Sequence, residues 1–451
     1  AGTRAGPAAL RAAQHTASQS SQAICYCHDL WGERHVKDAA ERAIGQRRMH
    51  YGIVILVMST LVVFGALGLA RFGYSILLAP MQSALGLDNT QAGALATANL
   101  AGYLVLSVVG GALASRYGPR AVIAAGLALA GAAMILTGLA GGMASAAFWR
   151  GVTGLGSGAS NVPVMALLAA WFAPRRRGLA AGIGVSGSSF ALILLGPAVP
   201  LLLARFGESG WRVCWGVLGA VTLVLASAAW LLLRNHPADV GALPLGTLPG
   251  DPPPAPRGAP LRWARVYRSW TVWHLGLVYV AFGFSYIIYL TFFVKYLMAG
   301  GGYTQPEAGR VFMLMGWCSV LCGLIWGTVS DALGRKWALV IVYAIQAAAF
   351  ALFALAPNPP GFTASAVLFG ITAWSIPAIM AAACGDMLGP RMAPAALGFI
   401  TLFFGIGQAA GPSVAGALAD ASGSLESSFM LAAGVAVLGG AGAALLRPHA
   451  E

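Results

Sequence analysis

Long apolar segments, separated by short polar loops, dominate the chain from about residue 50 onward. A transmembrane helix needs about 20 mostly apolar residues, and twelve segments reach that length. They begin near Ile53, Ala92, Ala121, Ala144, Gly178 and Val213, and then near Thr271, Ala308, Trp337, Phe362, Ala395 and Ser428. The pattern therefore predicts an all-α membrane protein with twelve transmembrane helices in two bundles of six.

The two groups of six are separated by residues 234–269, which contain the proline-rich run Asp251–Pro256. Proline-rich segments stay extended and do not pack into a core. We therefore expect a cytoplasmic linker here. It joins an N-terminal six-helix bundle at 49–233 to a C-terminal bundle at 270–447, and a tail follows at 448–451.

Residues 1–48 differ from the rest of the chain because they are polar and lack apolar periodicity. Met49 directly precedes the first apolar segment, so we expect residues 1–48 to be a disordered or non-native extension upstream of it. The candidate metal ligands of this extension are Cys25, Cys27, His28 and His35. Their spacing fits no zinc site, and we predict neither a metal site nor a cofactor.

Short motifs recur between the two halves, and this repetition indicates a duplicated six-helix unit. The repeated pairs are Thr90–Gly93 with Thr304–Gly309, Gly111–Arg120 with Gly327–Lys336, Pro174-Arg175 with Pro390-Arg391, and Gly196-Pro197 with Gly411-Pro412. The last three pairs are separated by 216, 216 and 215 positions. Transporters built from such repeats bind their substrate where the two halves meet, near the middle of the bilayer.

Composition and charge agree with membrane insertion. The chain is 58% hydrophobic and 9% charged, whereas soluble domains have about 25% charged residues. Basic residues gather in alternate loops, namely Arg116, Arg120, Arg175–Arg177, Arg234, Arg257, Arg335, Lys336 and Arg391. Because Lys and Arg mark cytoplasmic loops, we expect a multi-pass protein of the bacterial inner membrane with both termini in the cytoplasm. The basic residues of the cytoplasmic loops then account for the net charge of +13, and no nucleic-acid partner is expected.

The second-half loop contains Gly327, Asp331, Gly334, Arg335 and Lys336. This loop resembles the signature of the major facilitator superfamily of transporters, in which it stabilises one conformation. The resemblance implies a gating role for these residues. We expect the glycines to allow close approach and a tight turn, and Asp331 to sit at a helix N-terminus.

The first-half copy of that loop keeps Gly111 and Arg120 but has Ser115 in place of the expected Asp and Pro119 in place of a basic residue. That difference puts gating through the first loop in question. Arg150, followed by several glycines, resembles the fourth-helix motif of proton-linked members and implies a coupling or structural role. The segments Ala70–Tyr74 and Ala98–Leu104 are similar to a YbfB-type bacterial branch.

Charged residues inside a membrane are costly and are therefore candidates for function. Arg71 lies nine residues before Pro80, roughly 13 Å from the helix end at 1.5 Å per residue. Its guanidinium could bind an anion or make a structural pair. Polar residues at similar depth could line the same site or simply bond neighbouring helices; they are Asn99, Tyr103, Asn161, Tyr286, Tyr289 and Gln408.

The spans contain no Asp or Glu at mid-membrane depth, which argues against a cationic substrate. We therefore predict a secondary active transporter that moves a small organic anion by alternating access. A proton is a candidate co-substrate, and a monomer is expected. An efflux transporter for drugs or metabolites is the alternative, and a non-transporting membrane sensor a distant one. No nucleophile–base pair lies within the spans, so we do not expect an enzyme.

Overall fold

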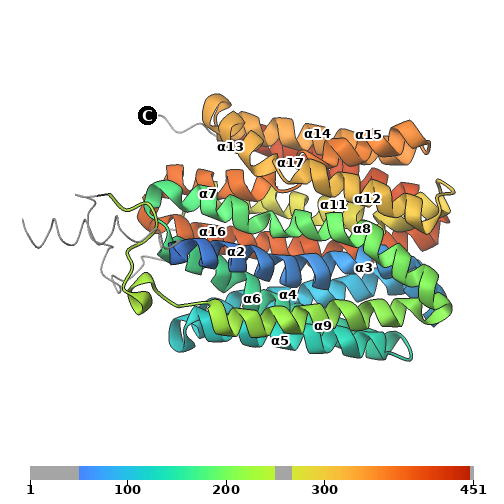
Figure 1. Cartoon of the computed structure of the whole chain (residues 1–451). Helices are drawn as coiled ribbons and strands as arrows, with labels where there is room; N and C mark the ends of the chain where they lie inside the picture. The colour runs from blue at the N-terminus through green and yellow to red at the C-terminus, as the bar shows by residue number, and fades with distance from the viewer. Residues whose placement is uncertain (1–49, 249–266, 447–451) are drawn as a thin grey trace, which may run out of the picture. The chain divides into compact units, whose positions relative to one another are not determined.

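A computed structural model describes residues 50–248 and 267–446, without the side chains of 324 and 387–395. The extension at 1–48, the middle of the linker and the tail at 448–451 lie outside the described residues. The rest is a bundle of long helices that run side by side (Figure 1).

The first half of the bundle has six spans. They are α2 (Tyr51–Val63) continued by the π-helix η1 (Phe64–Phe72) and α3 (Gly73–Leu85), then α4 (Asn89–Tyr117), α5 (Pro119–Gly138), α6 (Met143–Trp171), α7 (Pro174–Val185) continued by α8 (Gly187–Phe206), and α9 (Gly210–Leu232). The short η2 (Gly207–Ser209) joins α8 to α9. Just after α9 comes η3 (Pro237–Val240), and Leu245 pairs with Phe172 at the end of α6.

The second half has six more spans. They are α11 (Trp270–Ala299), α12 (Gln305–Ser319) continued by α13 (Cys322–Leu333), α14 (Arg335–Leu355), α15 (Pro359–Gly370) continued by the first part of α16 (Ser375–Ser422), the second part of α16, and α17 (Glu426–Ala444).

Ten described helices are long and apolar enough to cross a membrane. One of them, Pro174–Leu232, holds two crossings because η2 separates α8 from α9. The interrupted span of α12 and α13 is a further crossing whose two pieces are each short. The twelve-helix prediction is confirmed, and the predicted starts lie within four residues of the helix starts.

The repeated loop motifs have the same backbone conformation. Gly118 (φ 84°, ψ 143°) and Gly334 (φ 81°, ψ 156°) each precede the next helix. Positive φ strains residues with a Cβ, which explains glycine at both places. The structural repeat therefore matches the sequence repeat.

The most extensive contacts between the two halves are two equivalent helix pairs, α4 with α16 and α8 with α12, and α3 also contacts α11. A Cβ added at Gly93 would overlap the carbonyl oxygen of Pro412, and one added at Gly309 would overlap that of Gly196. Small residues let membrane helices approach this closely. Two of the four repeated motif pairs, those with Gly93 and Gly309 and those with Gly196 and Pro412, therefore touch across the interface.

The ends of the bundle differ in how closely the halves pack. We call the end with Arg116 and Arg335 the basic end, and the opposite end, with Asn89 and Asp420, the far end. From Asn89 to Leu104, α4 lies against α16. Beyond that point, Val105, Val108 and Val109 of α4 are exposed.

Glycines near the basic end follow the same trend. Nothing lies within 4 Å of a Cβ built at Gly111, Gly182, Gly323 or Gly327. The expectation that Gly111 and Gly327 mediate a close helix approach is therefore wrong in this conformation, because the helices that carry them are apart there.

Candidate functional site

Arg71 belongs to η1, a π-helical stretch inside the first span. Such stretches are rare and often occur at functional sites. Gly68, one turn earlier, packs so closely on α8 that a Cβ there would overlap Ala191. This packing holds η1 in the bundle interior, and the Arg71 side chain is only 7% exposed.

The Arg71 guanidinium has weak neutral partners. Its Nη1 lies 3.5 Å from the Tyr286 hydroxyl, and its carbon lies 4.3 Å from the centre of the Tyr103 ring. The Nε and Nη2 atoms are buried and have no hydrogen-bond partner among the described residues. These two nitrogens form one edge of the guanidinium, and such an edge can bind a carboxylate with two parallel hydrogen bonds.

A polar chain runs through Arg71 from one half of the bundle to the other. Gln408 Nε2 donates to the hydroxyl of Tyr286. Asn161 Nδ2 donates to the hydroxyl of Tyr103 over 2.9 Å. The structure thus brings together five of the predicted site residues from α16, α11, η1, α4 and α6.

Asn99 and Arg150 form a second group beside this chain. Asn99 Nδ2 donates to the carbonyl oxygen of Arg150 over 3.1 Å, and Arg150 Nη1 donates to that of Ala70 over 2.7 Å. The Arg150 guanidinium also lies over the rings of Tyr74 and Trp215, at 4.7 and 5.1 Å. Arg150 therefore connects α6 to the residue that precedes Arg71.

A small cavity of about 10 Å³ lies between Arg71, Asn99 and Arg150, which is about the space of one water molecule. Its other lining residues are Phe72, Tyr74, Ser75, Ala96, Leu100, Ile287 and Thr291. The lining contains two guanidinium groups and no carboxylate. Its electrostatics therefore favour an anion.

Tyr289 does not join this site. Its ring packs against Phe350, Phe353 and Phe369, and its hydroxyl lies 2.7 Å from the Ser365 hydroxyl. The structure therefore separates Tyr289 from the other predicted substrate residues. It lies inside the second half because of the rotation of α11 about its axis.

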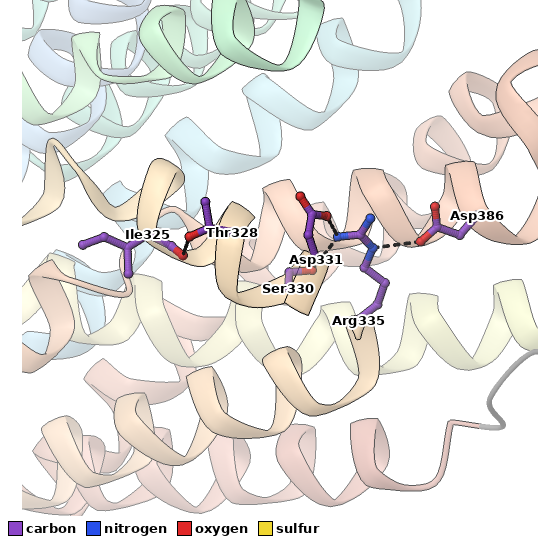
Figure 2. A network of polar contacts seen from close by, with 6 residues as sticks. All are labelled: Ile325, Thr328, Ser330, Asp331, Arg335 and Asp386. Atoms are coloured by element: carbon purple, nitrogen blue, oxygen red, sulfur yellow. Dashed lines mark hydrogen bonds and ion pairs between the residues drawn. The ribbon is translucent and has the colours of Figure 1, made fainter. Parts of the chain in front are cut away.

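Two predicted gating residues of the second half, Asp331 and Arg335, form an ion-pair network with Asp386 at the basic end. Figure 2 shows Arg335 between Asp331 and Asp386, and the bond from Arg335 Nε to Asp386 measures 2.8 Å. Asp331 lies in the last turn of α13, so its expected place at a helix N-terminus is wrong. Lys336 lies over the Trp337 ring at 5.6 Å.

Arg120, the first-half counterpart, contacts its own half. Its backbone N–H donates to Asn235, and its Nε donates to the Trp230 carbonyl oxygen over 2.6 Å. Arg120 thus ties the start of α5 to the end of α9.

Sequence reasoning did not identify the contacts that join the halves at the far end. Asp420 accepts hydrogen bonds from the backbone and side chains of Asn89 and Thr90, over 2.6 to 3.1 Å. Lys295 donates to Gln82 and Asn89. A capping box, Asp88–Gln91, marks the start of α4 in the structure, but this motif gives no sign that the helix start has a partner on α16.

The chain is similar to known membrane transporters. The family described as "Uncharacterised MFS-type transporter YbfB" matches residues 63–444. A probable sulfoacetate transporter of Cupriavidus necator is 26% identical over 84% of this chain and 90% of its own length. Human monocarboxylate transporter 11 is 29% identical over 74% of this chain and 70% of its own length.

The fold also matches a solved structure. It is a bacterial homologue of the human lysosomal transporter Spinster, in an inward-facing and unoccupied conformation, with a TM-score of 0.72 and 17% identity. The match covers 89% of this chain and 97% of that one. With twelve membrane helices in two related halves and a family match over most of its length, the chain belongs to the YbfB-type family of major facilitator transporters and is a membrane transporter, not an enzyme.

Proposed function

We propose that this protein is a secondary active transporter of small organic anions that works by alternating access. The observation that carries the proposal is the buried Nε–Nη2 edge of Arg71, which has no partner among the described residues. The proposed substrate site consists of Arg71, Asn99, Tyr103, Asn161, Tyr286 and Gln408.

The energetics favour an anionic ligand. Taking a charged group out of water costs several kcal/mol unless an opposite charge and hydrogen bonds replace the water. Arg71 and Arg150 are 7% and 1% exposed, and neither has an ion-pair partner among the described residues. A bound carboxylate or sulfonate would supply the missing countercharge. Arg71 is the better placed of the two to bind it, since Arg150 is engaged by Ala70 and two rings.

The relatives support the same class of substrate. The probable sulfoacetate transporter and monocarboxylate transporter 11 are both named for organic anions. Their identities to this chain are below 30%, so they support the charge of the substrate and not its identity.

The packing of the halves supports alternating access. Hydrogen bonds between the halves are concentrated from the middle of the bundle to the far end, as with Thr97 to Ala409 and Thr90 to Asp420. We propose that the basic end faces the cytoplasm of a bacterial cell, in line with the distribution of Lys and Arg in membrane proteins. This conformation would then be an inward-facing one of a monomer in the inner membrane.

Uptake of organic anions into proteoliposomes tests the proposal. Arg71→Ala removes the charge and both free donors, and uptake should fall to background. Arg71→Lys keeps the charge but loses the two-donor edge, and the apparent affinity should fall about tenfold.

Arg310→Ala is the matched control, because Arg310 is an exposed arginine at the start of α12 whose side chain is 70% exposed. It should transport like the unmodified protein. Each variant must give a monodisperse peak in detergent. Unchanged anion uptake by a well-folded Arg71→Ala variant would remove Arg71 from the site and with it the basis of the proposal.

A further inference from the structure

The amide of Asn99 has a fixed orientation. Its Nδ2 donates to the carbonyl oxygen of Arg150 over 3.1 Å. A carbonyl only accepts hydrogen bonds, so the opposite flip would set two acceptors against each other. The Oδ1 atom must therefore point the other way.

That Oδ1 atom is a buried acceptor without a partner among the described residues. Asn99 is 1% exposed and lines the cavity of about 10 Å³ that Arg71 and Arg150 also line. A buried polar atom left without a hydrogen bond costs stability. A ligand that enters here gains by bringing a donor to Asn99 as well as an anion to Arg71.

The surrounding charge limits what that donor can be. An ammonium group would donate well, but it would lie beside the guanidinium groups of both Arg71 and Arg150, and like charges at such distances repel. A neutral hydroxyl donates a hydrogen bond without that repulsion. Arg71, which carries the donor edge, and Asn99, which carries the acceptor, line the same water-sized cavity, so a ligand that uses both groups needs its hydroxyl close to its carboxylate.

We infer that the preferred substrates are 2-hydroxycarboxylates, with the carboxylate on the Nε–Nη2 edge of Arg71 and the hydroxyl donating to Asn99 Oδ1. This inference rests on the proposed anion transport and narrows it to one chemical class. Both residues belong to the first half of the bundle, on η1 and α4, so they stay together when the halves separate. Thr291 and Ile287 of α11 close the cavity from the second half.

Matched carboxylates that differ only at the second carbon test the inference. Lactate, alanine and propionate carry a hydroxyl, an ammonium and a hydrogen there, and malate with succinate gives a second pair. Binding to the purified full chain is measured by calorimetry and by thermal shift, since a ligand that binds the folded state raises its apparent stability. Lactate should bind at least about tenfold more tightly than propionate, because the unsubstituted acid leaves the acceptor unpaired. Alanine should bind more weakly than lactate.

The variant Asn99→Ala removes the acceptor. The Asn99→Ala protein should keep its affinity for propionate, while the ratio of its affinities for lactate and propionate should fall to about one. A general loss of stability would not change this ratio. The matched control is Gln346→Ala. Gln346 is also a buried amide that donates to a backbone carbonyl and has an unpartnered oxygen, but it lies in the second half, bonded to Thr372. The control should keep the preference for lactate.

The possible results separate the two proposals. Equal binding of lactate and propionate, or of malate and succinate, overturns the hydroxyl inference and leaves anion transport standing. A preference for lactate that survives Asn99→Ala overturns the role of Asn99. Failure of every carboxylate to bind, where neutral solutes do bind, overturns both. If Asn99→Ala does not fold, the comparison of acids on the unmodified protein still decides the substrate class.

Discussion

Arg150 donates a hydrogen bond of 2.7 Å to the carbonyl oxygen of Ala70, the residue just before Arg71. Ala70 and Arg71 both lie in the π-helix η1, whose hydrogen bonds are shifted by one residue relative to those of an α-helix. Arg150 makes its contact from α6, and its guanidinium lies over the rings of Tyr74 and Trp215. We therefore propose that Arg150 positions Arg71.

The substitution Arg150→Lys tests this relationship. Lysine keeps the positive charge, but its ammonium lacks the planar group that stacks on the two rings. Arg71 should then be less well held, and the KM for a transported anion should rise about tenfold, the effect of losing one hydrogen bond to a charged group. The maximal rate should change less.

Uptake measured over a range of anion concentrations separates these two parameters. Arg310→Lys, at an exposed position, is the control and should leave both unchanged. An unaltered KM in Arg150→Lys would show that Arg71 keeps its place without Arg150.

Close contact between the backbones of helices from the two halves should be essential for closing the far end of the bundle to solvent, which we call the seal. In Gly309→Ala the new methyl group meets the Gly196 carbonyl oxygen, and in Gly93→Ala it meets that of Pro412. Overpacking of this kind costs roughly 1–3 kcal/mol, so the two halves should separate more at the far end. Either variant should lower transport and expose the residues between the halves.

A cysteine introduced as Thr97→Cys in a cysteine-free protein reports this opening. Thr97 bonds Ala409 across the interface, and an impermeant maleimide applied from the far end should label it faster in both glycine variants. Gly434→Ala is the control because its Cβ meets nothing within 4 Å. Equal labelling rates in all three would mean that the far end does not depend on this contact.

Asp420 should strengthen the same seal. Its two carboxylate oxygens accept four hydrogen bonds from Asn89 and Thr90, at the start of α4. A carboxylate also interacts favourably with the positive N-terminus of a helix. Removal of the group in Asp420→Ala should speed labelling of Thr97→Cys several-fold, and Asp420→Asn, which keeps one acceptor oxygen, should have an intermediate effect.

Glu426→Ala provides the comparison for Asp420, since Glu426 is an acidic residue of the same end that bonds Tyr296 within its own half. It should leave labelling unchanged. If Asp420→Ala labels no faster than Glu426→Ala, the capping contact is not part of the seal.

The sequence by itself determined the spans, because each needs about 20 apolar residues and a break in that pattern marks a loop. It also determined the repeat, which Gly118 and Gly334 reproduce in backbone angles. The prediction of Arg71 as a candidate followed from the cost of a charge in the membrane.

Only the tertiary structure decided which polar residues share a site. Tyr286 and Tyr289 are three residues apart on a helix that is apolar on every side, so its sequence does not show which face meets the first half. In the structure Tyr286 contacts Arg71, whereas Tyr289 lies among phenylalanine rings. The partner of Asp420 was equally hidden, because its contact with Thr90 joins residues 330 positions apart. The reason is physical: the pattern of apolar residues fixes the depth of a helix in the membrane, while packing against its neighbours fixes its rotation.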